Sequence, residues 1–132
     1  MAKRKKKQGP KQNGWVYILT IVIGNTVYKK IGTTNRTVRH RLLEVAGELH
    51  DNLGYIPVMQ IVSEQQTMNN YQVEAELLKL TAEHRPKPGK ELNDKFSGWS
   101  ELRCMDLDKL KTLLAECVAK DYPAIKPTLI EM

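Results

Sequence analysis

The segment from residue 15 to residue 23 constrains the fold more than any other part of the chain. Its sequence, WVYILTIVI, is almost continuously apolar and rich in aromatic and β-branched residues. Such a segment is typical of a β-strand that is covered on both faces. Gly24-Asn25 follows as a two-residue turn signal, and residues 26–31 form a second β-rich segment. The sequence therefore predicts an antiparallel hairpin.

Three later segments have the periodicity or the flanking residues of helices. They cover residues 36–49, a segment from Asn69 or Asn70 to His84, and a last helix that ends near Lys120. We expect Thr34 or Asn35 to cap the first helix and Asp106 or Asp108 to cap the last one, through side-chain oxygens. The Pro- and Gly-containing segment 85–89 ends the second helix.

Two further segments predict extended structure. Residues 56–62 are apolar enough for a third strand, and residues 99–104 indicate a short strand or extended segment. The order β-β-α-β-α-(β)-α predicts a small α/β sandwich with helices against a central sheet. We expect one domain over residues 14–122, followed by a C-terminal tail over residues 123–132.

Charge is distributed unevenly along the chain. The formal net charge is +6, but residues 1–11 hold six cations and no acid, and the remaining residues hold 15 cations and 15 anions. Residues 1–13 contain almost nothing apolar, so we expect a disordered basic arm. Its role would be a sequence-independent DNA tether made by Lys3, Arg4, Lys5, Lys6 and Lys7. The bulk charge alone does not predict that the domain binds nucleic acid.

Several classes of protein are excluded by simple features. Two cysteines, Cys104 and Cys117, are too few for a disulfide scaffold, so we expect two free thiols in a cytoplasmic protein. No Cys/His cluster has the spacing of a zinc site. The nine-residue apolar segment is too short to cross a membrane, so we expect no membrane association and no secretion.

Glu74 is out of place on the predicted second helix. At 100° per residue it falls inside the apolar sector that Val73, Leu77, Leu78 and Leu80 define. An unpaired carboxylate on an inward face is costly, so Glu74 requires a partner cation, a metal or a water-lined cleft. The alternative is that this face is the edge of the helix and Glu74 points to solvent.

The segment between Lys29 and Arg41 contains five cations and no acid. A solvated basic face is one interpretation. The other is a surface that faces DNA phosphates, where arginine binds phosphate oxygens through two hydrogen bonds. On that interpretation the DNA-binding residues are Lys29, Arg36 and Arg39.

Three motifs in this order and spacing, WVYIL, KIGTT and TVRHRLLEV, resemble the GIY-YIG nuclease superfamily. The resemblance is greatest to the phage-type branch, in which the second motif is K-I-G. The place of the first motif is taken by Gly14, Trp15, Val16 and Tyr17, and that of the second by Lys30, Ile31 and Gly32. By analogy, a phage or mobile element is a plausible source.

The resemblance continues into the helices. Thr34 fits the G-x-T that follows the second motif, and Arg41 fits the arginine of the first helix. Glu74, followed by Leu77-Leu78, is similar to the family's E-x-x-L-H, with Leu78 where histidine is frequent. Residues 99–102 weakly resemble the branch's terminal segment.

The resemblance implies a small three-stranded antiparallel sheet flanked by helices, and metal-dependent hydrolysis of DNA phosphodiester bonds. Glu74 would hold one Mg²⁺ (or Mn²⁺), and Arg41 would bind the non-bridging phosphate oxygens. Tyr17 would accept or relay the proton of the attacking water. Lys30 would supply positive charge to Tyr17 or act as the base, with Tyr28 as an alternative hydroxyl on the same side of the strand.

Some positions depart from the family pattern. Lys30 replaces the tyrosine of the second motif, Leu78 replaces the common histidine, and Asn93 is the only nearby candidate for an asparagine that many members carry. The leading hypothesis is therefore a small endonuclease of weak sequence specificity, or one that a protein partner targets. The alternative is a catalytically inactive nucleic-acid- or protein-binding module on the same scaffold.

Overall fold

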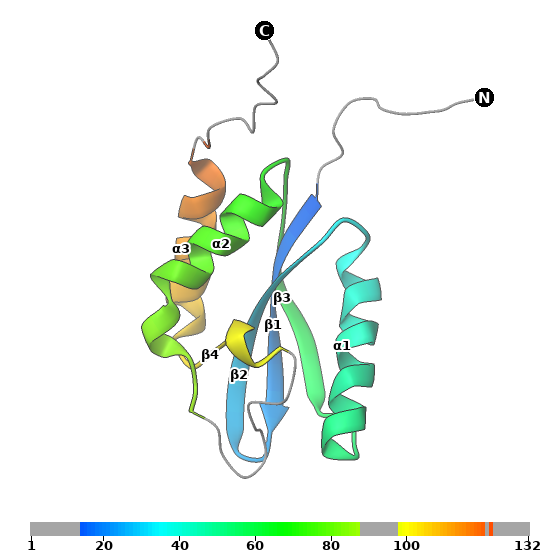
Figure 1. Cartoon of the computed structure of the whole chain (residues 1–132). Helices are drawn as coiled ribbons and strands as arrows, with labels where there is room; N and C mark the ends of the chain where they lie inside the picture. Colours follow the sequence, from blue (N-terminus) through cyan, green and yellow to red (C-terminus); the bar gives the residue numbers. More distant parts are fainter. Residues whose placement is uncertain (1–13, 88–97, 121, 123–132) are drawn as a thin grey trace, which may run out of the picture.

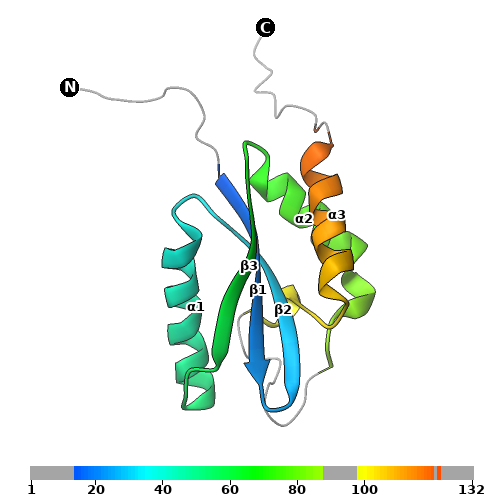
Figure 2. The ribbon, with the colours of Figure 1, turned by 180° about the vertical axis from the view of Figure 1, so that it is seen from behind.

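A four-stranded antiparallel sheet separates two layers of helix in the described part of the chain (Figure 1). The computed structural model describes residues 14–87, 98–120 and 122. Helix α1 covers one face of the sheet, and α2 and α3 cover the other (Figure 2). The elements are β1 (Gly14–Ile23), β2 (Thr26–Thr34), α1 (Val38–Leu53), β3 (Val58–Thr67), α2 (Asn70–Leu80), η2 (Ala82–His84), η3 (Trp99–Glu101), β4 (Leu102–Arg103) and α3 (Leu107–Ala119).

The predicted hairpin is confirmed, and its first strand is central in the sheet. The strand order is β3-β1-β2-β4, so β1 has a neighbour on each side. Side chains of β1 alternate between two cores: Tyr17 and Leu19 pack on the α1 side, and Val16 and Ile18 pack on the α2–α3 side. This double cover explains why the segment is apolar throughout. The predicted small antiparallel sheet with flanking helices is present, and β4 is its short fourth strand.

The predicted cap of α1 was wrong. Thr37 caps the helix, and its side chain accepts a hydrogen bond from the His40 backbone N–H at 3.1 Å. Thr34 cannot cap because it is still paired in the sheet, opposite Trp15. The helix begins at Val38 and ends four residues later than the sequence predicted, at Leu53. Gly54 then takes a left-handed conformation, with φ 82°, which ends the helix.

Two other boundaries also differ from the prediction. Strand β3 continues through the polar residues up to Thr67, because an edge strand exposes part of its surface to water. Helix α2 starts at Asn70 as expected but ends at Leu80, and residues 82–84 form a 3₁₀ turn. The predicted cap Asp106 is confirmed, since its side chain accepts from the Lys109 N–H at 3.0 Å.

Several predictions concern residues outside the described ones. They include the arm 1–13, the tail 123–132 and Asn93. The two cysteines are free thiols, as predicted, with Cys104 exposed and Cys117 buried. Within the described segments, no helix has both the length and the apolar character that a membrane crossing requires.

Candidate active site

Tyr17 lies at the centre of the candidate site. Its side chain is fully buried, and its backbone pairs with Gly32 of β2 and Glu64 of β3. The ring crosses over Gly32 so closely that a Cβ at that position would overlap the Tyr17 hydroxyl. Only glycine leaves the space that this tyrosine occupies. The K-I-G motif therefore has a packing role in addition to any chemical one.

The hydroxyl of Tyr17 is buried and has no hydrogen-bond partner among the described residues. A buried polar atom without a partner costs about 1–3 kcal/mol. Most buried polar groups in native proteins are satisfied, so each exception calls for an explanation. A ligand or reacting water that completes the hydroxyl's hydrogen bonding is one such explanation.

Arg41 of α1 is half-buried on the same side of the sheet. Its Nη1 donates a hydrogen bond to Glu44 Oε1 at 3.0 Å. Burial opposes the charged form, but Glu44, Tyr17 and Glu48 outweigh it and raise the pKa of Arg41. The guanidinium is thus within electrostatic reach of the Tyr17 hydroxyl.

Lys30 brings a second cation to Tyr17. Its side chain is 1% exposed, and its Nζ lies 5.7 Å from the centroid of the Tyr17 ring. The same Nζ donates to Glu101 Oε1 at 2.6 Å. A buried ammonium requires such a partner, because an uncompensated buried charge is strongly destabilising. The expectation that Lys30 supplies positive charge to Tyr17 therefore has a geometric basis.

Glu74 of α2 faces this cluster. Burial raises the pKa of its carboxyl, and the charge of Glu101 raises it further, while Lys30, Thr33 and Arg41 act in the opposite direction. Glu74 is therefore within electrostatic range of both Glu101 and the two cations. The helical-wheel prediction of an inward Glu74 agrees with this placement, and the solvent-facing alternative does not.

Glu101 is the site residue that sequence reasoning missed. It appeared only within a weak motif, and its carboxylate is the direct partner of Lys30. Strand β4 places it, because Leu102 pairs with Lys30 across the sheet. The sequence did contain a usable signal. Lys30 is two residues after Tyr28, so both side chains point to the same face of the strand. A buried lysine on that face requires a carboxylate from elsewhere in the chain.

Arg103 fastens the segment that carries Glu101 to the helix that carries Glu74. Arg103 is 3% exposed, and its guanidinium makes four hydrogen bonds. The acceptors are Thr81 Oγ1 at 2.8 Å, Ser100 O at 2.8 Å, Leu102 O at 2.7 Å and Leu78 O at 3.1 Å. Arg103 is therefore a positioning residue: it holds the two carboxylate-bearing segments together.

The predicted cationic surface is only partly assembled. Successive side chains of β2 point to opposite faces of the sheet. Lys29 is on the same face as Ile31, which packs on the α2–α3 side, so Lys29 is on the opposite face from Tyr17. Arg36 and Arg39 are exposed near the start of α1. The same period places Tyr28 on the Tyr17 side.

Two details of that surface correct the sequence-based picture. Glu44 accepts hydrogen bonds from Arg41 and Arg36, and both interactions lower its pKa. The segment between Lys29 and Arg41, which contains no acid, therefore has an acidic partner one helical turn further along α1. Tyr28 pairs with Ile21, four residues along β1 from Tyr17, or about 13 Å at the rise of a β-strand. Tyr28 is therefore a core residue outside the cluster.

A divalent cation is compatible with the carboxylates of the cluster. The described residues contain no group of three or more His, Cys, Asp or Glu side chains that could hold a metal. Mg²⁺ requires fewer protein ligands, because it keeps several waters and binds through one or two carboxylates plus substrate phosphates. Glu74 and Glu101 repel each other, as the raised pKa of Glu74 indicates. A cation beside Glu74 would remove that repulsion.

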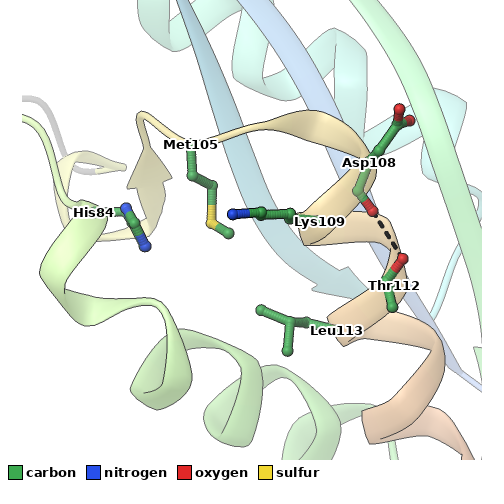
Figure 3. Close-up of a pocket in the computed structure, with 6 residues that line it drawn as sticks. All are labelled: His84, Met105, Asp108, Lys109, Thr112 and Leu113. Carbon is green, nitrogen blue, oxygen red and sulfur yellow. Dashed lines mark hydrogen bonds between the residues drawn. The ribbon is translucent and has the colours of Figure 1, made fainter.

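A surface groove lies away from this cluster, between the end of α2 and the start of α3 (Figure 3). Its lining side chains are His84, Met105, Asp108, Lys109, Thr112 and Leu113. The Thr112 hydroxyl donates to the Asp108 carbonyl at 2.9 Å, a bond within the helix. None of these residues belongs to the Tyr17 cluster, so the groove does not bear on its chemistry.

Comparisons with known proteins give no family for this chain: no family model matches it, and neither the curated proteins nor the solved structures contain a significant match. The function therefore has to be argued from the cluster itself.

Proposed function

We propose that the chain is a small metal-dependent endonuclease that hydrolyses DNA phosphodiester bonds. One observation carries the proposal: the buried hydroxyl of Tyr17 has no partner among the described residues, and the two cations near Tyr17, Lys30 and Arg41, also interact electrostatically with the half-buried carboxylate of Glu74. The GIY-YIG resemblance implies the same residues in the same roles. Hydrolysis of a phosphodiester requires a base for water and positive charge for the phosphoryl oxygens, and the cluster offers both.

Arg41 is the proposed phosphate-binding residue. A guanidinium has five N–H donors, and the described contact to Glu44 uses Nη1. The remaining donors can bind the non-bridging oxygens of a phosphate in a bidentate manner. Charge that develops on those oxygens during attack would be stabilised by a group already fixed on the α1 face.

Tyr17 is the proposed acceptor or relay of the water's proton. Its hydroxyl has capacity for both a donated and an accepted hydrogen bond. Lys30 and Arg41 place positive charge around this oxygen, and negative charge that develops there is stabilised by them. Glu101 keeps Lys30 in place through the 2.6 Å ion pair.

Glu74 is the proposed ligand of Mg²⁺ or Mn²⁺. When bound, the metal supplies Lewis-acid polarisation of the phosphate. Glu74 must be ionised to bind it, and its raised pKa means that the ionised fraction grows over a higher pH range than for a free glutamate. The carboxylate therefore couples cation binding to pH.

Plasmid nicking tests the proposal directly. Purified protein is incubated with supercoiled plasmid, with Mg²⁺ or with a chelator, and compared with Glu74→Gln and Arg41→Ala. We expect each variant to lose roughly 10²- to 10³-fold in rate, the scale for removal of one transition-state contact. Glu76→Gln is the matched control, because Glu76 is on the same helix but pairs with Lys120 at 2.7 Å, outside the cluster.

The outcome separates the two functional classes. Nicking by wild type and by Glu76→Gln, with loss in Glu74→Gln, supports the enzyme. If wild type and Glu74→Gln leave the plasmid equally intact with and without metal, the chain is not a nuclease. Retained DNA affinity in that case would favour the inactive binding module.

A further inference from the structure

An exposed tyrosine lies one helical turn from the proposed metal ligand. Tyr71 is 62% exposed although it is a large aromatic residue. It precedes Glu74 by three residues on α2. Residues three apart on a helix are neighbours on one face, with Cβ atoms about 5–6 Å apart. The Tyr71 ring is therefore next to the carboxylate end of the Tyr17 cluster.

Side-chain hydrogen bonds hold this tyrosine in place. Asn35 Nδ2 donates to the Tyr71 hydroxyl at 2.9 Å, and Asn70 Nδ2 donates to Asn35 Oδ1 at 3.1 Å. Asn70 is 4% exposed, so the chain of amides is anchored in the protein interior. Gly14 packs against the same two amides, and a Cβ there would overlap them. Three separate segments thus fix the position of one exposed ring.

This arrangement leaves the ring of Tyr71 available for contact, while its hydroxyl accepts a hydrogen bond from Asn35. The hydroxyl already has a partner in Asn35, whereas the ring surface is exposed. A fixed aromatic ring loses little conformational freedom when it binds, which favours recognition. Met68, two residues before the start of the same helix, is a second exposed apolar side chain, at 60%.

Cations accompany the ring. Arg36 follows Asn35 directly and its side chain is 60% exposed; its Nη2 donates to Glu44 Oε2 at 2.9 Å, and a guanidinium has further N–H donors for a phosphate. Arg39 is exposed one turn further along α1. Aromatic rings with neighbouring cations are the features by which proteins bind single-stranded nucleic acid: bases stack on the rings and cations contact the backbone. Tyr71 with Arg36 has this composition.

We infer that the preferred substrate is DNA with an unpaired nucleotide beside the scissile phosphate, and that its base stacks on Tyr71. This inference rests on the proposed nuclease function and names the substrate class of the same site. A base within a duplex already has neighbours on both faces, so it cannot offer a face to the ring. The Cβ spacing of about 5–6 Å expected for Tyr71 and Glu74 corresponds to one to two nucleotide steps at the duplex rise of about 3.4 Å per strand. A base and its neighbouring phosphate can therefore contact the two residues together.

Binding is measured first, without metal, so that no cleavage occurs. The probes are a duplex and the same duplex with a single-stranded extension that carries 2-aminopurine at its first unpaired position. The proteins are wild type, Tyr71→Leu, Tyr71→Phe and Tyr55→Leu. Tyr55 is the matched control, because it is 46% exposed between α1 and β3 and outside the cluster.

We expect Tyr71→Leu to weaken binding of the extended probe by roughly 5- to 100-fold, the scale for loss of one base–aromatic stack, with little change for the duplex. Tyr71→Phe keeps the ring and should retain most of the affinity. Wild type and Tyr55→Leu should quench the 2-aminopurine fluorescence through stacking. The quenching by wild type is informative even if a Tyr71 variant does not fold.

Three results would overturn the inference. They are equal wild-type affinity for the two probes, an equal loss on both probes in Tyr71→Leu, or no quenching by wild type. The nuclease proposal fails separately, through absence of metal-dependent plasmid nicking. If nicking persists while any of these three results is obtained, the enzyme stands and the role of Tyr71 is rejected. If the binding results hold without nicking, the ring binds unpaired DNA on a non-catalytic module.

Discussion

The Lys30 ammonium and the Glu101 carboxylate meet at 2.6 Å, although 71 residues separate them in the chain. The lysine side chain is 1% exposed and the glutamate side chain is 30% exposed, so the two ends of the ion pair differ in their contact with water. Loss of the glutamate would leave a buried ammonium without the carboxylate that is hydrogen-bonded to it. Loss of the lysine would leave a carboxylate that water can still reach.

This asymmetry predicts unequal effects of the two single substitutions. Glu101→Gln should reduce the free energy of unfolding by about 2–4 kcal/mol, because breaking a buried pair leaves an uncompensated charge. Lys30→Met should cost less, and the double variant should be more stable than Glu101→Gln alone. Urea denaturation of the four proteins measures this cycle. Additive effects of the two substitutions would show that the pair does not contribute as a unit.

Tyr17→Phe should be inactive but at least as stable as wild type. The substitution removes a buried hydroxyl that has no partner among the described residues, which relieves a penalty of about 1–3 kcal/mol. Thermal unfolding and plasmid nicking are measured on the same preparation. A clear loss of stability would indicate that the hydroxyl is hydrogen-bonded in solution, and retained nicking would remove Tyr17 from the mechanism.

Gly32→Ala should destabilise the protein, and Tyr17→Phe should partly restore it. The new methyl group would overlap the Tyr17 hydroxyl, and forced packing of this kind costs about 1–3 kcal/mol. Phenylalanine lacks the oxygen but keeps Cζ, which a Cβ at position 32 would also overlap, so the restoration should be small. Denaturation midpoints of both variants and of the double variant measure the rescue. Gly47→Ala is the control, because a Cβ there meets nothing within 4 Å.

Glu74 predicts a dependence of stability on pH. Its folded pKa is raised above the unfolded value, so the folded state holds this proton more tightly and stability falls as pH rises from the unfolded pKa through the folded pKa. Glu74→Gln should therefore be more stable than wild type above this range and similar to it below. Added Mg²⁺ should raise the melting temperature of wild type alone. An equal Mg²⁺ effect on both proteins would contradict Glu74 as the ligand.

The basic N-terminal arm predicts a change in the salt dependence of DNA binding. Deletion of residues 1–11 removes six cations. If all six contact phosphates, the log–log slope of affinity against salt should fall by about five units. Fluorescence anisotropy over a salt series gives the slope for the full chain and the truncated chain. Equal slopes would assign the arm to another role.

Local sequence patterns predicted the features that local physics controls. The apolar segment 15–23 and the Gly24-Asn25 turn specified the hairpin, because strand cover and turn conformation depend on neighbouring residues. The wheel position of Glu74 predicted an inward carboxylate, since helical geometry relates it to Val73 and Leu77. The predicted ends of helices and strands were less accurate where strand pairing determines them. Thr34 pairs with Trp15 in the sheet, so it cannot cap α1.

The remaining features depend on contacts between distant segments. Glu101 joins the site only because β4 pairs with β2, and two residues of strand give almost no periodic signal. Nothing in the sequence distinguishes Arg103 from a surface arginine, yet it is buried and its guanidinium donates to backbone carbonyl groups of α2 and η3. Glu44 neutralises part of the apparent cationic surface by reaching back to Arg36. No local sequence pattern predicts these contacts between side chains of distant segments.

The central position of β1 gives the two halves of the cluster different lifetimes. Tyr17 is on a strand with partners on both sides and helices over both faces, so its amide should exchange with solvent only when the whole domain unfolds. Glu101 is on a short 3₁₀ segment at the border of the sheet, where partial opening costs less. The backbone around Tyr17 should therefore stay protected from exchange until global unfolding, whereas the amides of the Glu101 segment should exchange at a lower opening free energy.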